Sequence, residues 1–168
     1  MRSKTISNIV GQESCKAVLV TLVNYAKMQN EAVPHCLLSG PSGFGKTSIA
    51  QALAHDIGSN LFTVNCAGVG KPNKLFAIID EMADKDILFM DEVHGLTKKT
   101  SESLYTVLED FCYYDEGYKR DTPKITVIGA STEIGKLPLP FKARFKFTAS
   151  LVSYTDEQLI DVCYQICE

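Results

Sequence analysis

The sequence predicts an α/β fold in which helices cover both faces of a parallel β-sheet, giving three layers, α-β-α. Segments with helical periodicity alternate with short β-rich apolar runs along most of the 168 residues. Residues 87–90 are continuously apolar, which is typical of a strand that is buried on both faces of a parallel sheet. A glycine-rich segment, residues 40–47, joins one apolar run to a helix-like segment.

The composition indicates one globular domain, because hydrophobic residues make up 45% and charged residues 22% of the chain. No apolar run approaches the roughly 20 residues that span a bilayer, and residues 1–4 lead into no signal-peptide core, so we expect a cytoplasmic protein without membrane contact. The six cysteines include no Cys-x-x-Cys pair, which predicts reduced thiols. The net charge of −3 excludes an overall basic field, so any contact with DNA is local or comes from a partner or an assembled ring.

The first element expected is a helix over residues 13–30. Ile9 and Val10 precede it, and two interpretations stay open for them: part of a pocket for a nucleotide base, or a hydrophobic staple for the helix. The core-facing residues of the helix recur at helical spacing and are Cys15, Leu19, Leu22, Val23 and Ala26.

Strands and helices then alternate. We expect a strand over residues 36–38, a helix over residues 47–57 that ends at Gly58, and a second strand over residues 61–65. Pro72 suits the opening of the next helix, because its missing N–H is not needed in a first turn.

The glycine-rich loop fits the phosphate-binding pattern of a glycine, four residues and Gly-Lys-Thr. Its glycines let backbone N–H groups point at phosphate oxygens, and the helix N-terminus adds positive potential. Lys46 would reach the outer phosphates of ATP, and the Thr47 hydroxyl would hold Mg²⁺. A plain glycine-rich turn is the alternative, but it does not explain a Lys-Thr pair at this offset. The residues expected to bind nucleotide are Gly40, Pro41, Ser42, Gly43, Phe44, Gly45, Lys46, Thr47 and Ser48.

Two acids, Asp91 and Glu92, end the apolar strand that begins at Ile87. Parallel sheets bind ligands at the carboxyl ends of their strands. Asp91 would hold the Mg²⁺ through water, and Glu92 would polarise the attacking water as the catalytic base. Acids at strand ends are often solvated turn residues, but the phosphate-binding loop one strand and one helix upstream favours the catalytic role.

His94 follows, where it could orient Glu92 or cap the turn, and a structural role is favoured. A helix then leads to a short hairpin or loop over residues 111–124 and a strand over residues 125–130. The Thr132 hydroxyl would lie beside the γ-phosphate if this strand neighbours the first one. The alternative is a plain polar strand end.

The Leu-Pro-Leu-Pro segment at residues 137–140 breaks regular structure, and residues 145–147 are expected to form the last strand. Arg144, one of three arginines, is the kind of planar cation that stabilises a phosphoryl-transfer transition state in trans. Thr155 would open a final helix with Gln158 at capping-box spacing. The apolar face of this helix would consist of Leu159, Ile160, Cys163 and Ile166.

Four groups of residues together resemble the AAA+ ATPases, and within them most closely the RuvB branch-migration motors. These groups are residues 9–13, 40–47, 88–94 and the stretch from Ile128 to Phe145. The likeness covers nearly the whole chain. It implies a P-loop NTPase fold of the AAA+ type, with a five-stranded parallel sheet in the order 5-1-4-3-2, assembled as a homo-oligomeric ring, usually a hexamer, with ATP between neighbours.

The resemblance also implies roles for individual residues. Ile9 and Val10 would contact adenine, and Thr132 matches the sensor-one position. Arg144 matches the finger that reaches the γ-phosphate of the adjacent subunit. The roles of the phosphate-binding loop and of the two acids would be those already expected from the motifs.

Two departures from the resemblance concern domain organisation. Residues 111–124 are too few for the hairpin that docks the partner RuvA, which puts coupling to RuvA in doubt. Residues 1–153 would form the large AAA+ subdomain, and residues 154–168 would form the first helix of a lid, without the second sensor arginine or a DNA-binding winged helix.

The leading hypothesis is an ATPase domain of a RuvB-like DNA motor that acts in Holliday-junction branch migration, recombination and repair. One alternative is a clamp-loader or helicase-loader ATPase switch in DNA replication. Another is a nucleotide-gated interaction module with little turnover.

Overall fold

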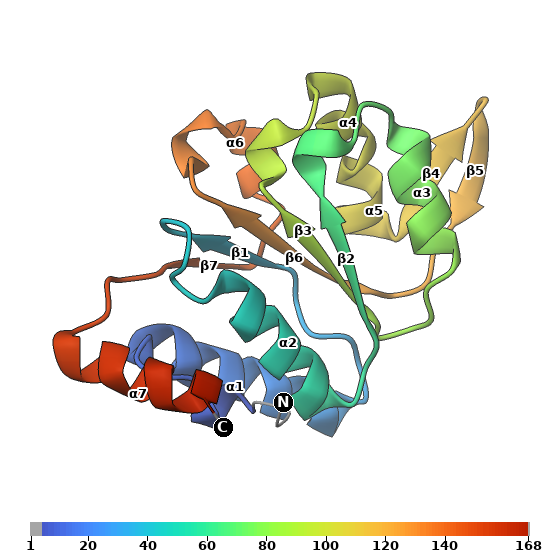
Figure 1. The fold of residues 1–168 in the computed structure, drawn as a ribbon. Coiled ribbons are helices and arrows are strands. Elements are labelled where there is room, and N and C mark those ends of the chain that lie inside the picture. The colour runs from blue at the N-terminus through green and yellow to red at the C-terminus, as the bar shows by residue number, and fades with distance from the viewer. Residues whose placement is uncertain (1–4, 168) are drawn as a thin grey trace.

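A five-stranded parallel sheet forms the centre of the molecule in the computed structural model, which describes residues 5–167 apart from the side chain of Ile166 (Figure 1). The sheet order is β2-β3-β6-β1-β7, and two further strands form a separate hairpin. The labels β4 and β5 belong to the hairpin. If only the five strands of the sheet are numbered in chain order, their spatial order from the β7 edge is 5-1-4-3-2. The expected α/β class is confirmed. The strands are β1 (Cys36–Ser39), β2 (Leu61–Asn65), β3 (Ile87–Asp91), β6 (Thr126–Ser131) and β7 (Phe147–Ser150).

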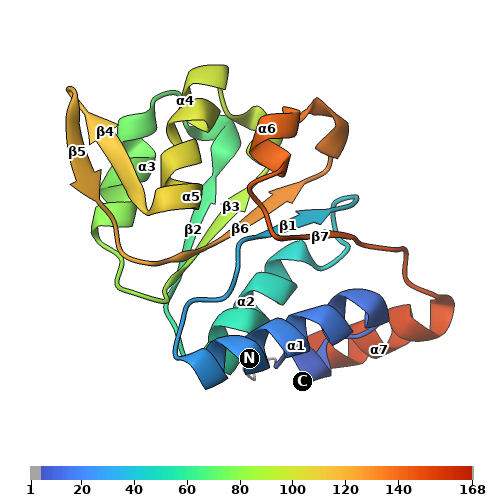
Figure 2. The same cartoon turned by 180° about the vertical axis from the view of Figure 1, so that it is seen from behind.

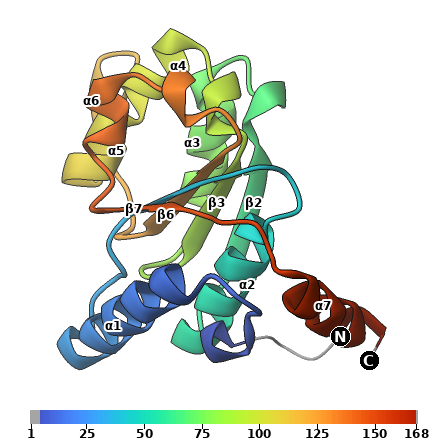
Figure 3. The ribbon, with the colours of Figure 1, turned by 90° about the vertical axis from the view of Figure 1, so that its left-hand side faces the viewer.

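Helices cover both faces of the sheet, as Figures 2 and 3 show from two further sides. One face carries α1 (Glu13–Gln29) and α2 (Lys46–Ile57), and α7 (Asp156–Cys167) lies on the same side. The other face carries α3 (Pro72–Asp80), α4 (Lys98–Ser103) and α5 (Tyr105–Asp110). Single-turn helices complete the chain: η1 (Ile6–Asn8), η2 (Cys66–Gly68), η3 (Val93–Gly95), η4 (Ile134–Lys136) and the short α6 (Leu139–Lys142).

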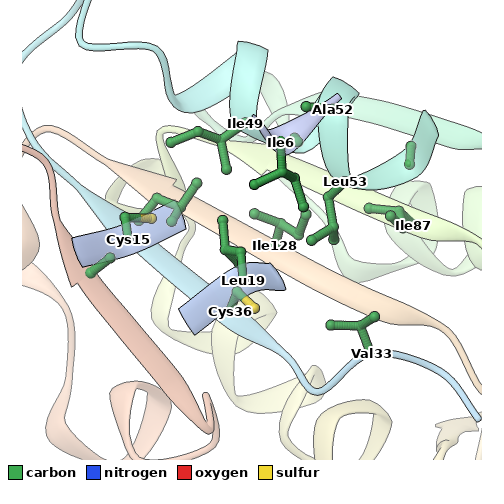
Figure 4. Packing of buried hydrophobic residues seen from close by; sticks show 14 of the residues in the cluster. Ile6, Cys15, Leu19, Val33, Cys36, Ile49, Ala52, Leu53, Ile87 and Ile128 are labelled. Carbon is green, nitrogen blue, oxygen red and sulfur yellow. The ribbon is translucent and has the colours of Figure 1, made fainter. Parts of the chain in front are cut away.

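The core consists of two layers, one on each face of the sheet, because successive residues of a strand point to opposite faces. Leu38 packs in the layer with α1 and α2, whereas Leu37 packs in the layer with α3 and α5. Figure 4 shows the first layer, in which Leu19 of α1 and Leu53 of α2 meet Ile128 of the sheet. Continuous apolar strands therefore supply both layers at once.

Most element boundaries agree with the sequence patterns. The helix α2 ends at Gly58, whose φ of 76° is the left-handed conformation favoured after a helix, and α3 begins at Pro72. The single helix expected before residue 111 is instead two short helices that meet at Leu104. Phe111 follows in the left-handed conformation, with a φ of 51°, and ends the second one.

The expected last strand at residues 145–147 is wrong by two positions, because β7 begins at Phe147 and runs to Ser150. Phe145 belongs to the turn that closes α6, since its N–H donates to the Lys142 carbonyl over 3.1 Å. Its ring packs edge-on against Phe141, with centroids 5.2 Å apart, in the layer with α3 and α5. Burial of this ring therefore holds the backbone out of the sheet until Phe147 pairs with Cys36.

Residues 111–124 contain the hairpin that was one of the two expectations. Its strands are β4 (Cys112–Asp115) and β5 (Tyr118–Asp121). The turn residues Glu116 and Gly117 both have positive φ, 48° and 84°, as in the two-residue turn whose twist matches paired strands. The hairpin extends from the side of the sheet that carries α3 and α5 (Figure 1).

The final helix α7 begins with the expected capping box. The Thr155 N–H donates to Gln158 Oε1 over 3.1 Å, and the Gln158 N–H donates to Thr155 Oγ1 over 3.2 Å. Two residues of its expected apolar face, Leu159 and Ile160, are 46% and 55% exposed, so residues 5–167 leave these two side chains about half uncovered. Ile166 lies outside the described side chains.

The described cysteines are all free thiols, with Cys163 and Cys167 exposed and the other four buried. No helix within residues 5–167 is long and apolar enough to cross a bilayer.

Candidate active site

The glycine-rich loop connects β1 to α2, as the motif requires. Gly43 and Gly45 have φ angles of 83° and 91°, a region that residues with a Cβ rarely adopt. The helix α2 begins directly after them at Lys46, so the first N–H groups of the helix have no partner within it. The loop therefore ends in the positive pole of a twelve-residue helix, where an anion is stabilised.

The loop and the end of β3 form opposite walls of one cleft of about 230 Å³. They meet because β1, β6 and β3 are parallel neighbours, so their carboxyl ends share one edge of the sheet. The structure thus brings six of the nine predicted loop residues together with both predicted acids. The residues that line the cleft are Ser42, Gly43, Gly45, Lys46, Thr47, Ser48, Asp91 and Glu92.

Lys46 lies at the base of the loop, with only 7% of its surface exposed. Its ammonium group donates to the carbonyl oxygens of Gly40 and Pro41 over 2.6 and 2.9 Å. A lysine has three N–H donors, so one donor remains after these two bonds. The two carbonyls hold the charge inside the loop, where it can reach a phosphate oxygen.

Gly40 does not line the cleft, but it lets the chain directly after β1 lie close to the chain directly after β7. A Cβ on this residue would lie 3.2 Å from the Cβ of Leu151, and its φ of 148° is outside the range that other residues prefer. Its N–H donates to the Ser131 carbonyl over 3.2 Å. The loop is therefore anchored to the strands on both sides of β1.

Asp91 and Glu92 are adjacent but point in different directions. The Glu92 backbone has a φ of 50°, an uncommon left-handed conformation for a residue with a side chain, and this turns its carboxylate away from the line of the strand. Asp91 Oδ1 accepts a hydrogen bond from the Glu92 N–H over 3.0 Å. The backbone conformation at Glu92 thus separates the two neighbouring carboxylates, and their roles in binding Mg²⁺ and activating water stay predictions.

Glu92 is contacted by two residues that the sequence had singled out separately. Its Oε2 atom accepts from the Thr132 hydroxyl over 2.9 Å and from the Thr132 N–H over 3.3 Å. His94 Nδ1 lies 3.1 Å from the same oxygen. The strand β6 pairs directly with β3, which places Thr132 at the end of one strand beside Glu92 at the end of the other.

A divalent cation fits the donors of this cleft. The Thr47 hydroxyl and the Asp91 carboxylate both line it, and both are the hard oxygen ligands that Mg²⁺ prefers. Mg²⁺ usually takes only one or two protein ligands and completes its shell with water and phosphate. Two oxygen donors facing a phosphate-binding loop are therefore sufficient.

The predicted base contacts lie outside the cleft lining. Ile9 is 6% exposed and packs in the layer with α1 and α2, so its side chain belongs to the core. Val10 is half-buried. Contact of these residues with adenine stays a prediction.

Tyr154 is a residue of this site that the sequence did not indicate. Its hydroxyl donates to the Phe44 carbonyl over 3.3 Å. A Cβ on Gly45 would lie 2.8 Å from the hydroxyl oxygen of Tyr154. The rings of Phe44 and Tyr154 are tilted to each other with centroids 6.3 Å apart. No local motif marks this tyrosine, because the contact joins positions 110 residues apart.

Arg144 lies away from the cleft and is bound within its own chain. Its guanidinium stacks 3.9 Å above the Tyr105 ring, Nη2 pairs with Glu109 over 3.2 Å, and Nη1 donates to the Pro140 carbonyl over 2.5 Å. Its Nε is buried and bonds to none of the described residues. Arg144 therefore does not line the nucleotide cleft of its own chain.

Comparison with known proteins connects this cleft to one family. The chain matches the family described as the Holliday junction DNA helicase RuvB P-loop domain over residues 1–151. It is similar to the solved Holliday junction branch migration motor RuvB of Thermotoga maritima, with 32% identity and a TM-score of 0.86, over 99% of this chain and 55% of that one. A mutant of Thermotoga maritima RuvB matches with 33% identity and a TM-score of 0.90, over 98% of this chain and 54% of that one. The chain spans about half the length of these structures.

Proposed function

Because this chain belongs to the family of RuvB P-loop domains, we propose that it binds ATP with Mg²⁺ and hydrolyses ATP as the motor domain of a RuvB-like protein. Such a protein would drive the migration of branched DNA in recombination and repair. The cleft supports this proposal most directly, since a phosphate-binding loop faces Asp91 and Glu92 across it. A phosphate-binding loop alone would equally suit a protein that only binds nucleotide.

The residues of the cleft divide the chemistry among them. The N–H groups of the loop and the Lys46 ammonium bind the β- and γ-phosphates and orient the γ-phosphoryl group. Thr47 and Asp91 would hold Mg²⁺, which when bound neutralises the charge that develops on the phosphate oxygens. Glu92 orients the attacking water and accepts its proton, and Thr132 holds the carboxylate that does so.

Assembly and partners follow from the same proposal. A homo-oligomeric ring, with six subunits as the expected number, would place ATP between neighbours and DNA in contact with the assembled ring, since the single chain carries a net charge of −3. Residues 1–153 would be the large subdomain and residues 154–168 the start of a lid. The two-residue turn of the β4-β5 hairpin leaves little surface for docking of the RuvA type.

One observation favours a second candidate, a nucleotide-gated interaction module. The Arg144 guanidinium is held by Glu109 and Tyr105 of its own chain, so a single chain has no arginine at its γ-phosphate site within residues 5–167. In this case the chain would bind ATP, capture a partner and turn over slowly. A clamp-loader or helicase-loader switch would behave in the same way until its target is reached.

Substitution of the catalytic base tests the motor proposal. We expect Glu92→Gln to lower ATP hydrolysis by about 100-fold or more, because the amide cannot accept the proton of water, while ATP binding persists. Hydrolysis is measured alone and with branched or single-stranded DNA, and binding is measured by calorimetry. Lys46→Ala should instead lose ATP binding.

The control is Glu102→Gln, the same change at an exposed site on α4 whose partner Lys98 lies 3.9 Å away. It should hydrolyse ATP like the wild type. Turnover by Glu92→Gln at the wild-type rate would contradict the proposed base. ATP binding without turnover by the wild type, together with capture of a partner, would favour the interaction module.

A further inference from the structure

His94 lies between two carboxylates at the edge of the proposed site. Its Nδ1 atom is 3.1 Å from Glu92 Oε2 and 3.0 Å from Ser131 Oγ, and its Nε2 atom is 3.4 Å from Glu133 Oε1. Only 17% of the His94 side chain is exposed. The ring thus lies next to the residue that follows β3, the last residue of β6 and the segment after β6 at once.

Every hydrogen bond to the Glu92 side chain within residues 5–167 goes to the same oxygen, Oε2. The donors are the Thr132 hydroxyl and the Thr132 N–H, and His94 Nδ1, which shares a hydrogen bond with Ser131 Oγ, lies 3.1 Å from the same oxygen. Oε1 accepts from none of the described residues, and Glu92 lines the cleft. We propose that His94 is a positioning residue for ATP hydrolysis, which together with Thr132 fixes the rotation of the Glu92 carboxylate so that Oε1 faces the attacking water.

The donor and acceptor chemistry requires a particular form of the histidine. A carboxylate can only accept hydrogen bonds, so Nδ1 has to carry a proton if the 3.1 Å contact with Glu92 is to be a hydrogen bond. The Ser131 hydroxyl accepts from the Glu133 N–H over 3.0 Å, and its second lone pair can accept from a protonated Nδ1, which lies 3.0 Å away. Glu133 is itself paired with Lys136 of η4 over 2.6 Å, which fixes the acceptor that faces Nε2. The ring is therefore held from both sides in the orientation that serves Glu92.

The turn does not need the imidazole for its own closure. The Gly95 N–H donates to the Glu92 carbonyl over 2.8 Å, and the Leu96 N–H donates to the Val93 carbonyl over 3.2 Å. These backbone bonds complete η3 without a side-chain cap. A role in capping the turn would therefore leave the contact between His94 and Glu92 unexplained.

A pair of isosteric substitutions tests the inference, which rests on the proposed ATPase function. In His94→Asn an amide N–H replaces Nδ1, whereas in His94→Gln it replaces Nε2. We expect His94→Ala and His94→Gln to lower kcat about tenfold, the loss of one hydrogen bond to a charged group, with KM for ATP unchanged. His94→Asn should stay within about threefold of the wild type, since the Nδ1 donor is restored.

His55→Asn is the control, because His55 is an exposed histidine of α2 whose Nδ1 lies 3.5 Å from Asp56 of the same helix. It should leave kcat unchanged. Equal losses in His94→Asn and His94→Gln would overturn the inference, and so would faster turnover in His94→Ala, which would mean that His94 restrains Glu92 and does not position it. Loss of ATP hydrolysis in Glu92→Gln with no effect of His94→Ala would overturn this inference and leave the proposed function intact.

A second measurement needs no hydrolysis. NMR spectra of the protein with ¹⁵N-labelled histidine, without nucleotide, report which ring nitrogen carries the proton. We expect a protonated Nδ1 at His94 and a shift of this signal in Glu92→Gln, while the His55 signal stays in place. An unchanged His94 signal in Glu92→Gln would show that the contact is absent. If the wild type hydrolyses no ATP at all, the proposed function fails while the spectra still decide whether His94 holds Glu92.

Discussion

His35 shows how one buried residue connects three elements. It is 6% exposed, its Nε2 donates to the Leu108 carbonyl over 3.1 Å, and its Nδ1 accepts from the Val127 N–H over 2.9 Å. The pKa of His35 is lowered from 6.5 to about 4, chiefly because burial disfavours the charged ring; the bond to Leu108 opposes this shift, and the nearby charge of Lys146 adds a smaller lowering. The ring is therefore neutral in the folded protein at pH 7, and it joins β6 and α5 to the start of β1.

Stability should depend on pH through His35. The folded pKa of His35, about 4, is below the unfolded value of 6.5, so below pH 6.5 the unfolded chain binds more protons and stability falls as the pH falls toward 4. Between pH 7 and pH 5 this residue alone should lower the free energy of unfolding by about 2 kcal/mol. Urea unfolding at the two pH values measures the difference.

Two variants separate His35 from the other titrating groups. His35→Gln should be less stable at pH 7 but should lose the part of the pH dependence that belongs to His35. His55→Gln, a change at an exposed histidine, should keep the wild-type dependence. A His35→Gln variant with the same pH dependence as the wild type would refute the assignment.

At the scale of elements, the segment that follows β7 connects two loops of the site. The Gln12 side chain donates to the Val152 carbonyl over 2.8 Å and accepts from the Val152 N–H over 3.0 Å. Next to this pair, Leu151 packs against Gly40, and Tyr154 reaches the carbonyl of Phe44. The loop before α1 and the phosphate-binding loop are thus held by the same segment.

Removal of the Gln12 amide should loosen this segment. Gln12→Ala leaves the N–H and carbonyl of Val152 unpaired in a half-buried place, which costs about 1–3 kcal/mol of stability. The φ of 55° at Gln12 adds strain for an alanine. Urea unfolding should show the loss, whereas Gln51→Ala, at an exposed position of α2, should stay within about 0.5 kcal/mol of the wild type. Equal stability of both variants would contradict the role of the pair.

At the scale of the whole molecule, the position of Arg144 suits action on a neighbour. It lies outside the cleft of its own chain, next to α6 and above Tyr105 of α5. In a ring with head-to-tail contacts, one surface of each subunit meets a different surface of the next, so a residue far from its own site can complete the site of a neighbour. Release from Glu109 would then accompany assembly.

Mixed rings test this action in trans. Arg144→Ala and Lys46→Ala should each be inactive alone, since one lacks the finger and the other the phosphate contact. An equimolar mixture should recover turnover, because about a quarter of random interfaces combine an intact loop with an intact finger. ATP hydrolysis and native mass measurements with a non-hydrolysable ATP analogue follow recovery and ring size. A mixture with no recovery, despite assembled rings, would argue against a finger in trans.

The kinds of elements and the phosphate-binding loop were determined by the sequence itself. Hydrophobic periodicity, Gly58 and Pro72 act over a few residues, and the Gly-Lys-Thr end of the loop carries its own local geometry. The capping box of α7 is equally local, as its two bonds span three residues. These features could be predicted because their causes lie within one or two turns of chain.

Only the tertiary structure decided which side chains meet. The start of β7 depends on where the Phe145 ring is buried, and the contacts of Tyr154, of Gln12 and of His94 with Glu133 join elements that are distant in sequence or separated by the sheet order. Such contacts follow from the packing of parallel strands, which brings the carboxyl ends of β1, β3 and β6 to one edge. A motif predicts which chemistry a residue can perform, whereas packing across the sheet determines which other residues lie next to it.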